Sequence, residues 1–287
     1  MITGTVADAY ATCESITREQ ARNFYYGIRL LPADKRTALC AVYALARRID
    51  DIGDGELPTA QKLAGLAEVR HALSGLSTDS ADPVVEAVAD CAERFPVPLE
   101  AFGELIDGVE MDVLGHSYAS FDELVEYCRC VAGAVGRLCL GVFGSRADRA
   151  APGYADALGI ALQQTNILRD IREDLINARV YLPQDELDRF GVELTLGEDG
   201  RLGDPDGGLA ALIRDSAQRA GEWYTEGLKL APMLDRRSAA CCLAMSGIYR
   251  RLLTQIDSEP SRVYHQRLSL SGWEKAGVAA RSLAGIR

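Results

Sequence analysis

The sequence predicts an all-α protein whose helices surround a central cavity. Apolar residues recur at spacings of three and four along most of the chain. Capping boxes and prolines stand where several of these stripes begin. We find no convincing alternating strand pattern and no repeat of solenoid length. The chain has 287 residues, 48% of them hydrophobic, and no Pro-rich or Ser-rich linker, so we expect one domain over residues 1–287.

The N-terminal half predicts five helices. The first opens at a capping box of Thr17 and Gln20 and closes at Pro32. The second is capped by Asp34 and carries the apolar stripe Leu39, Val42, Leu45, Ile49 and Ile52. The next three are expected over residues 63–73, 83–95 and 98–113.

The C-terminal half begins with a second capping box, formed by Ser120 and Glu123. It opens a helix whose apolar face comprises Leu124, Tyr127, Val131, Val135 and Leu138. A long helix is expected over residues 154–175. Residues 197–208 are rich in Gly and Asp and predict a loop. Two or three more helices are expected over residues 209–287.

Charge and composition restrict the location and the partners of the protein. The formal net charge of −11 argues against non-specific nucleic-acid binding, which needs a basic face. The start of the chain shows no secretory signal, and no apolar run is long enough to span a membrane. The eight cysteines lack paired C-x-x-C spacing. We therefore expect a cytoplasmic protein with reduced thiols, and contact with a membrane surface stays open.

Two acidic motifs are the most informative features. One spans residues 50–54, and the other spans residues 166–174. On helices, the four-residue spacing places Asp50 and Asp54 on one face, and Asn166, Asp170 and Asp174 on another. A divalent cation would offset the repulsion within each group, and Mg²⁺ prefers oxygen ligands together with substrate phosphates. The alternative is that both motifs are solvated helix faces.

Neighbouring residues favour an anionic ligand. Arg47 precedes Asp50 by three residues, and arginine is well suited to bidentate phosphate contact. Arg48 adjoins it, and either arginine alone could be a surface charge. Tyr43 lies one turn before Arg47, so both can face one ligand. Tyr127 lies on an apolar helix face, where a packing role is the alternative to a catalytic one.

Together these segments resemble the squalene/phytoene synthase family, the head-to-head trans-prenyltransferases, from about residue 20 to residue 267. The matching motifs are Tyr43-x-x-x-Arg47-x-x-Asp50-Asp51-x-x-Asp54, Tyr127-x-x-x-Val131-Ala132-Gly133-x-Val135-Gly136, Gln163-x-x-Asn166-Ile167-Leu168-Arg169-Asp170-x-x-x-Asp174 and Arg179-Val180-Tyr181-Leu182-Pro183. The resemblance implies an isoprenoid synthase-type helical bundle. It also implies two Mg²⁺–diphosphate sites, one on Asp50 and Asp54 and one on Asn166, Asp170 and Asp174.

The resemblance also implies roles for residues outside the acidic motifs. The substrate-binding set would be Arg22, Asn23, Tyr43, Arg47, Gln163, Arg169, Arg179, Tyr249 and Arg267. Tyr127 matches the family tyrosine associated with ionisation or proton removal. The metal and the arginines would draw off one diphosphate and leave an allylic cation. The double bond of the second chain would attack it, and proton loss would close a cyclopropane.

Within the family, the segment 21–32 and residues 48–54 look most like bacterial presqualene diphosphate synthases of the hopanoid pathway. That resemblance implies two farnesyl diphosphates as substrates and separate downstream enzymes that complete squalene. A phytoene or dehydrosqualene synthase of carotenoid biosynthesis is the first alternative, a head-to-tail prenyl elongation enzyme or a terpene cyclase the second. An alternative of another class is a non-catalytic helical interaction protein.

Gln20, and Arg129 and Cys130 after Tyr127, depart from the pattern of some family members. Gln20 stands where some members carry a basic residue, which leaves one phosphate contact in doubt. We expect no C-terminal membrane anchor of the kind found in eukaryotic squalene synthases. No glycine-rich dinucleotide fingerprint occurs in the sequence, which argues against the nicotinamide-dependent reduction step.

Overall fold

A computed structural model describes residues 6–21, 24–145 and 149–284 of the chain. The described secondary structure is helical apart from one isolated bridge between Leu196 and Leu202, which confirms the predicted all-α class. The α-helices are α1 (Val6–Gln20), α2 (Tyr25–Ile28), α3 (Ala33–Asp54), α4 (Thr59–Ser74), α5 (Pro83–Arg94), α6 (Glu100–Val113), α7 (Phe121–Cys128), α8 (Ala134–Phe143), α9 (Ala151–Ile176), α10 (Gln184–Phe190), α11 (Gly208–Gly227), α12 (Arg236–Ser258) and α13 (Gly272–Ala284).

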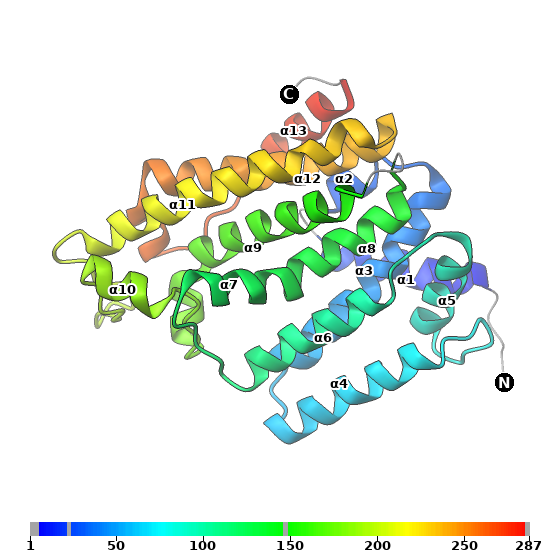
Figure 1. The fold of residues 1–287 in the computed structure, drawn as a ribbon, viewed down its shortest axis with the longest axis horizontal. Coiled ribbons are helices and arrows are strands. Elements are labelled where there is room, and N and C mark those ends of the chain that lie inside the picture. The colour runs from blue at the N-terminus through cyan, green and yellow to red at the C-terminus, as the bar shows by residue number, and fades with distance from the viewer. Residues whose placement is uncertain (1–5, 22–23, 146–148, 285–287) are drawn as a thin grey trace.

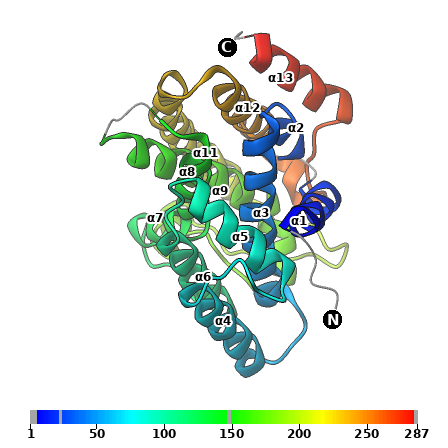
Figure 2. The same ribbon diagram turned by 90° about the vertical axis from the view of Figure 1, so that its right-hand side faces the viewer.

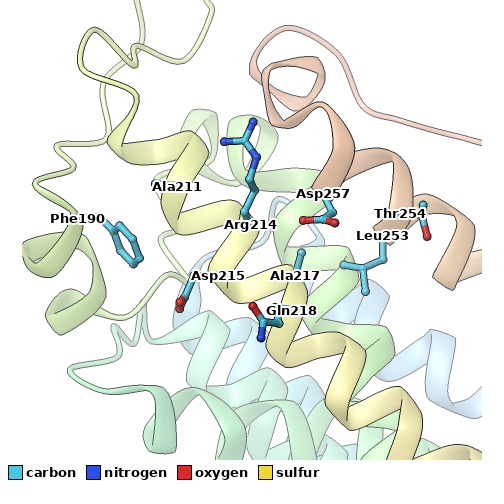
Figure 3. Close-up of a pocket in the computed structure, with 9 residues that line it drawn as sticks. All are labelled: Phe190, Ala211, Arg214, Asp215, Ala217, Gln218, Leu253, Thr254 and Asp257. Carbon is cyan, nitrogen blue, oxygen red and sulfur yellow. The ribbon is translucent and has the colours of Figure 1, made fainter.

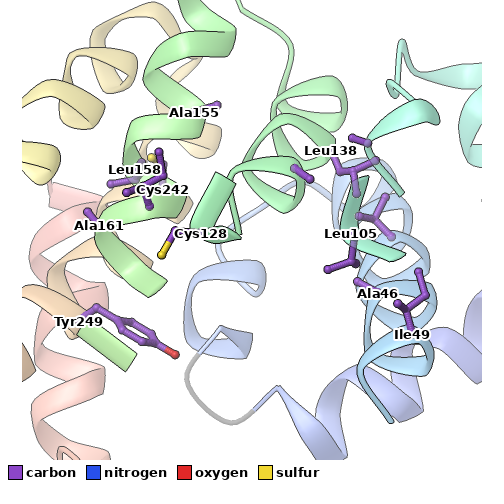
Figure 4. Close-up of a cluster of buried hydrophobic side chains, with 14 of the residues drawn as sticks. Ala46, Ile49, Leu105, Cys128, Leu138, Ala155, Leu158, Ala161, Cys242 and Tyr249 are labelled. Atoms are coloured by element: carbon purple, nitrogen blue, oxygen red, sulfur yellow. The ribbon is translucent and has the colours of Figure 1, made fainter. Parts of the chain in front are cut away.

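Helix α9 lies inside the bundle, where it packs against α8, α11 and α12 (Figure 1). Helices α4 and α13 lie at opposite extremes of the bundle in both orientations (Figures 1 and 2). Buried side chains from α3, α6, α8, α9 and α12 meet in one apolar cluster, part of which is shown in Figure 4. None of the described helices combines the length and the apolar composition that crossing a bilayer requires.

The predicted start of the first helix is wrong. Helix α1 begins at Val6, so Thr17 lies inside it rather than at its N-cap. Thr17 is buried, and its hydroxyl donates to the carbonyl of Cys13 at 2.7 Å. A Thr hydroxyl can satisfy the carbonyl one turn back, so a capping-box pattern inside a helix is easily misread. Asp34 is not a cap either, because α3 begins after Pro32 with no side-chain cap.

The second capping box is confirmed at Ser120, while the Glu123 side chain bonds to the amide before the N-cap rather than to that of the N-cap. The Ser120 hydroxyl accepts from the Glu123 amide at 3.4 Å, and the Glu123 carboxylate accepts from the Ala119 amide at 2.7 Å. The helix that follows is not continuous, however. A π-helical turn, η1 (Arg129–Gly133), separates α7 from α8. Such an insertion shifts the register of the side chains that follow it, and it commonly marks a functional site.

Glycines allow η1 to approach α9 closely. A Cβ atom on Gly159 would lie 2.3 Å from the Ala132 carbonyl oxygen and 2.6 Å from the Gly133 nitrogen. Both are backbone atoms, so the clash cannot be relieved by a side-chain rotation. Close contact here is what brings η1 and α9 together as adjoining walls of the cavity described below.

We expect Gly159→Ala to lower the free energy of unfolding by about 2 kcal/mol, because overpacking a filled contact costs roughly 1–3 kcal/mol. Gly153 is the matched control on the same helix, because a Cβ there would meet nothing within 4 Å. Gly153→Ala should stabilise the protein by up to about 1 kcal/mol through helix propensity. Chemical denaturation of both variants measures the difference. Equal effects would contradict the close approach of η1 and α9.

Candidate active site

The two acidic motifs meet at the polar end of an apolar cavity. Their aspartates occupy the last turns of α3 and α9: Asp50, Asp54, Asp170 and Asp174. Asp50 and Asn166 both line the cavity. Arg179, just after α9, forms a 2.9 Å ion pair with Asp54 and so joins the end of α9 to the end of α3. Motifs that are more than a hundred residues apart in the sequence therefore share one site.

Arginines neutralise part of this acidic site. Asp170 accepts hydrogen bonds from Arg169 at 2.7 and 2.5 Å, and from Arg267 at 2.8 and 2.9 Å. Arg169 is only 6% exposed, so its ion pair is largely removed from water. Arg47 lines the cavity and pairs with Asp51 rather than with Asp50.

The two adjacent arginines of α3 have different surroundings. Arg48 forms two hydrogen bonds with Asp82, at 2.5 and 2.9 Å. Asp82 is also the N-cap of α5, so this pair fixes α5 against α3. Arg48 is therefore the structural member of the pair, and Arg47 is the member that contacts the cavity.

Two of the aspartates remain short of positive charge. Burial raises the pKa of Asp50 to about 7, and the nearby carboxylates of Asp54, Asp51 and Asp112 add to the rise. Burial likewise raises the pKa of Asp174 to about 7, with Asp170 the main carboxylate beside it. Burial and like-charged neighbours keep such a carboxyl group partly protonated at neutral pH, and a cation bound beside it would favour loss of the proton.

The cavity itself is mostly apolar and has a volume of about 230 Å³. Its wall comes from α2 and its N-cap, α3, η1, α8, α9, the 3₁₀ turn η2 (Leu228–Met233) and α12. It includes Phe24, Ile28, Leu39, Val42, Ala46, Val131, Val135, Cys139, Phe143, Leu158, Leu162, Leu230, Cys242 and Met245. The polar groups are concentrated where Asp50 and Asn166 lie. The lining therefore suits an amphiphile with an anionic head and a hydrocarbon chain.

The remaining predicted binding residues divide into three groups. Tyr43 and Gln163 line the cavity beside Arg47. Tyr249 is buried and stacks on Phe24, with ring centroids 5.6 Å apart. Its side chain interacts electrostatically with Arg169, which belongs to the second acidic motif. Arg22 and Asn23 lie outside the described residues.

Tyr127 is not in the cavity wall. It is 2% exposed, and its ring centroid lies 5.3 Å from those of both Tyr118 and Tyr181. Its hydroxyl donates to the carboxylate of Asp112 at 2.8 Å, and the hydroxyl of Tyr181 donates to the same carboxylate at 2.8 Å. Tyr127 therefore belongs to a tyrosine cluster organised around one aspartate.

No role was predicted for Asp112 or Tyr118, and Tyr181 was predicted only as part of a motif. Asp112 lies on α6 next to Val113, at the end of an apolar stripe, which is the same setting as Asp50 on α3. Asp112 contributes to the raised pKa of both Asp50 and Asp174. An acidic residue at the end of an apolar helix stripe could therefore have indicated a site residue. Asp112 was missed because it has no second carboxylate one helical turn away.

The oxygen donors present are compatible with Mg²⁺ only if other ligands join them. Among the described residues, no three His, Cys, Asp or Glu side chains converge closely enough to hold a metal ion. Mg²⁺ usually binds through one or two carboxylates together with substrate phosphates. The buried side-chain oxygen of Asn166 has no hydrogen-bond partner in the described part of the chain. This oxygen and the carboxylates of the two acidic motifs are donors of the kind that a magnesium–diphosphate unit takes.

A second, wider depression lies on the outside of the bundle between α11 and α12 (Figure 3). It has a volume of about 620 Å³ and contains Arg214, Asp215 and Asp257. None of the residues predicted from the sequence to bind substrate or metal lines it. The candidate active site is therefore the smaller cavity, on the ground of its chemistry.

The chain resembles known proteins over most of its length. The family model for squalene/phytoene synthases matches residues 17–274. A protein from Mycobacterium tuberculosis named phytoene synthase is 59% identical over 97% of this chain and 92% of its own length. A phytoene synthase of Arthrospira platensis is 35% identical over 94% of this chain and 91% of its own length.

Solved structures show the same architecture. A dehydrosqualene synthase with bound ligand has a TM-score of 0.84 and 26% identity, covering 98% of this chain and 97% of its own. The squalene synthase HpnC from Alicyclobacillus acidocaldarius has a TM-score of 0.79 and 28% identity, covering 88% of this chain and 95% of its own.

The family match covers most of the chain, and close relatives span nearly its whole length. Enzymes of this family are prenyltransferases that use divalent metal ions with diphosphate substrates. The chain therefore belongs to the squalene/phytoene synthase family and is a prenyltransferase.

Proposed function

We propose that the protein joins two geranylgeranyl diphosphates head to head and forms phytoene, a C40 hydrocarbon. The observation that carries this proposal is the 59% identity, over 97% of the chain, to a protein named phytoene synthase. The presqualene diphosphate function expected from residues 21–32 and 48–54 has weaker support, because the relatives with that level of identity bear the phytoene name. We also propose that the chain is one domain, since one apolar cluster contains side chains from α1 to α13.

We propose that the acidic motifs hold the diphosphate groups. Asp50 and Asp54 would serve one diphosphate, and Asn166, Asp170 and Asp174 the other, in each case with Mg²⁺. The bound Mg²⁺ would supply Lewis-acid stabilisation of the diphosphate leaving group. Arg47, Arg169, Arg179 and Arg267 would contact phosphate oxygens, and Arg22 and Asn23 stay in this proposal as predicted contacts. Three of these arginines now pair with site aspartates, so ligand binding would exchange one anionic partner for another.

The apolar wall gives the reaction the surroundings that it needs. An allylic cation survives only where water and other nucleophiles are excluded. From Asp50 to Leu39, α3 lines the cavity over about 16 Å, at 1.5 Å of rise per residue. The rings of Phe24 and Tyr43 can stabilise positive charge by cation–π attraction. We expect the prenyl chain to lie along the cavity, with the diphosphate at its polar end.

The volume of about 230 Å³ implies that the wall moves when substrate binds. Pockets that bury small molecules usually measure roughly 300–1,000 Å³. Met245 lines the cavity and is unbranched, so it can change rotamer at low energetic cost. We expect the two prenyl chains to displace such side chains rather than the helices.

The test of chain length compares kcat/KM for geranylgeranyl diphosphate with kcat/KM for farnesyl diphosphate, each with Mg²⁺ and without nicotinamide. A preference for geranylgeranyl diphosphate and a C40 product support the phytoene proposal. A C30 product that keeps its diphosphate would establish the presqualene alternative instead. Dehydrosqualene would support the C30 carotenoid alternative.

A variant of the cavity wall should change this preference. Cys139 lines the cavity from α8, so Cys139→Phe would shorten the space for a hydrocarbon chain. We expect kcat/KM for geranylgeranyl diphosphate to fall at least about tenfold relative to that for farnesyl diphosphate, since a few methylenes in an apolar pocket are worth roughly 1–3 kcal/mol each. Cys139→Ala is the control and should leave the ratio unchanged. A parallel loss on both substrates would mean that Cys139 does not limit chain length.

A further inference from the structure

Three helices of the cavity wall end or begin near the apolar end of the cavity, away from the acidic motifs. On α3, which starts at Ala33, the lining residues run from Asp50 back to Leu39. On α8, the lining residue Phe143 is also the last residue of the helix. On α12, Cys242 is the lining residue nearest the N-terminus of the helix. These side chains mark the apolar end.

Lys35 of α3 joins the other two helices to its own at this end. Its ammonium group donates a hydrogen bond to the backbone carbonyl of Phe143, the last residue of α8. It also donates to the carboxylate of Asp235 at 2.7 Å and to the hydroxyl of Ser238 at 3.2 Å. One cation therefore holds the C-terminus of α8 and the N-terminus of α12 against α3.

This joint lies one helical turn beyond the cavity lining. Lys35 precedes Leu39 by four residues on α3, and the two therefore share a helix face. Ser238 precedes Cys242 by the same spacing on α12. Lys35 and Ser238 are outside the set of described residues that line the cavity. The joint therefore supports the apolar end of the cavity from behind.

Each contact of the joint suits the helix end at which it lies. The carbonyl of Phe143 is among the last four of α8, which have no partner within the helix, and a lysine there also complements the helix dipole. Asp235 is the N-cap of α12, and its carboxylate accepts from the amides of Arg237 and Ser238 at 2.9 and 3.1 Å. The Lys35 side chain is only 21% exposed, so these contacts are partly shielded from water.

We propose that Lys35 fixes the depth of the cavity and thereby limits the length of the prenyl chain that the enzyme accepts. This inference rests on the proposed condensation of prenyl diphosphates. The ammonium group holds the last turn of α8 in place, so Phe143 stays at the apolar end of the cavity. A longer chain would have to displace Phe143 and break this hydrogen bond. Lys35 is thus a positioning residue that acts through Phe143.

The test is Lys35→Met, which keeps an unbranched side chain but removes the ammonium group. We would measure kcat/KM with Mg²⁺ for diphosphates of C15, C20 and C25 prenyl chains. The ratio of kcat/KM for C25 to that for C20 should rise at least about tenfold, because a few carbons in an apolar pocket discriminate by that factor or more. The ratio for C15 to C20 should stay unchanged, since neither chain exceeds the depth of the wild-type cavity.

Two further variants separate this role from a general structural one. Lys35→Arg keeps the positive charge and the donors, so it should retain the ratios of the wild type. Lys62 provides the matched control, because its ammonium group donates to the carbonyl of Gly53 at 2.8 Å, near the polar end of α3. Lys62→Met should leave both ratios unchanged. A loss of stability alone would lower kcat/KM for all three substrates together.

An unchanged C25-to-C20 ratio in Lys35→Met would overturn the inference, as would an equal rise in Lys62→Met. If Lys35→Met does not fold, Asp235→Asn tests the same joint, because it keeps an oxygen for the N-cap and removes the charge that pairs with Lys35. That variant should raise the C25-to-C20 ratio as well, and an unchanged ratio would again overturn the inference. A wild type that prefers the C15 substrate would refute the proposed C40 product, and the inference would then require Lys35→Met to raise the C20-to-C15 ratio.

Discussion

Replacement of Asp50 by asparagine is expected to abolish turnover and, at the same time, to stabilise the metal-free protein at neutral pH. The turnover number should fall by about 1,000-fold or more, since metal ligands contribute several kcal/mol to transition-state stabilisation. The stability gain follows from burial and nearby carboxylates, which raise the pKa of Asp50 to about 7. When the pKa of a carboxyl group is higher in the folded state than in the unfolded state, the free energy of unfolding falls as pH rises from the lower pKa to the higher one.

The pH window follows from that shift. Below pH 4 the group is protonated in both states and adds nothing. Between about pH 4 and pH 7 the wild type loses stability because of Asp50, and above pH 7 the loss is complete, on the order of a few kcal/mol. Asp50→Asn removes this loss, so its melting temperature should exceed that of the wild type most clearly at pH 8 in EDTA. Asp51→Asn, at a half-exposed neighbour, is the control and should show little of either effect.

Asp170→Ala is expected to abolish turnover as well, but with the opposite effect on stability. Asp170 is the bonded carboxylate of Arg169, whose guanidinium is almost fully buried. Removing one partner of a buried ion pair costs about 3–5 kcal/mol, because the other charge stays buried and unpaired. For a chain of this size that corresponds to a fall in melting temperature on the order of 10 °C.

Arg267, the second partner of Asp170, separates the effect on stability from the effect on turnover. Arg267 is largely exposed, so its ion pair with Asp170 contributes little to stability. Arg267→Ala should therefore leave the melting temperature within about 2 °C of the wild type, while it raises KM for the prenyl diphosphate. Differential scanning calorimetry and steady-state kinetics on Asp170→Ala, Arg267→Ala and the wild type measure both quantities. An Asp170→Ala protein that melts like the wild type, or that keeps its turnover, would contradict the site geometry.

Much of the fold could be predicted because helix periodicity is a local signal. The stripe from Leu39 to Ile52 predicts α3 from the sequence alone, and α9 extends only a few residues beyond the predicted range 154–175. The wrong predictions came from sequence patterns that are compatible with two local structures. Thr17 followed by Gln20 fits a capping box, but Thr17 is equally stable in mid-helix with its hydroxyl on the carbonyl one turn back.

The π-helical turn η1 has no recognisable pattern in the sequence. Its apolar residues continue the 3.6-residue stripe from α7, so one continuous helix was the simplest prediction. The break depends on a tertiary contact, the approach of Ala132 and Gly133 to Gly159 on α9. Contacts of this kind lie outside any local window. Helix α10 was missed for another reason, because its local boundaries, Pro183 and Gly191, were not used as helix signals.

Part of the site could be predicted because the spacing of carboxylates along a helix is also a local signal. The four-residue spacing of Asp50 with Asp54, and of Asp170 with Asp174, predicted carboxylates that share a face, and the structure brings both groups to one cavity. Asp112 has no such spacing, and its significance comes from partners on two other elements. Chain length is the other limit, because cavity volume depends on side chains from several helices and no single motif encodes it.

The most direct test of the central claim is incubation of the purified protein with geranylgeranyl diphosphate and Mg²⁺, followed by mass spectrometry of the organic extract. The expected result is a C40 hydrocarbon that has lost both diphosphates, with no product when EDTA replaces Mg²⁺. A protein that binds neither geranylgeranyl nor farnesyl diphosphate and forms no coupled product with either would contradict the account and leave a non-catalytic helical protein as the remaining interpretation.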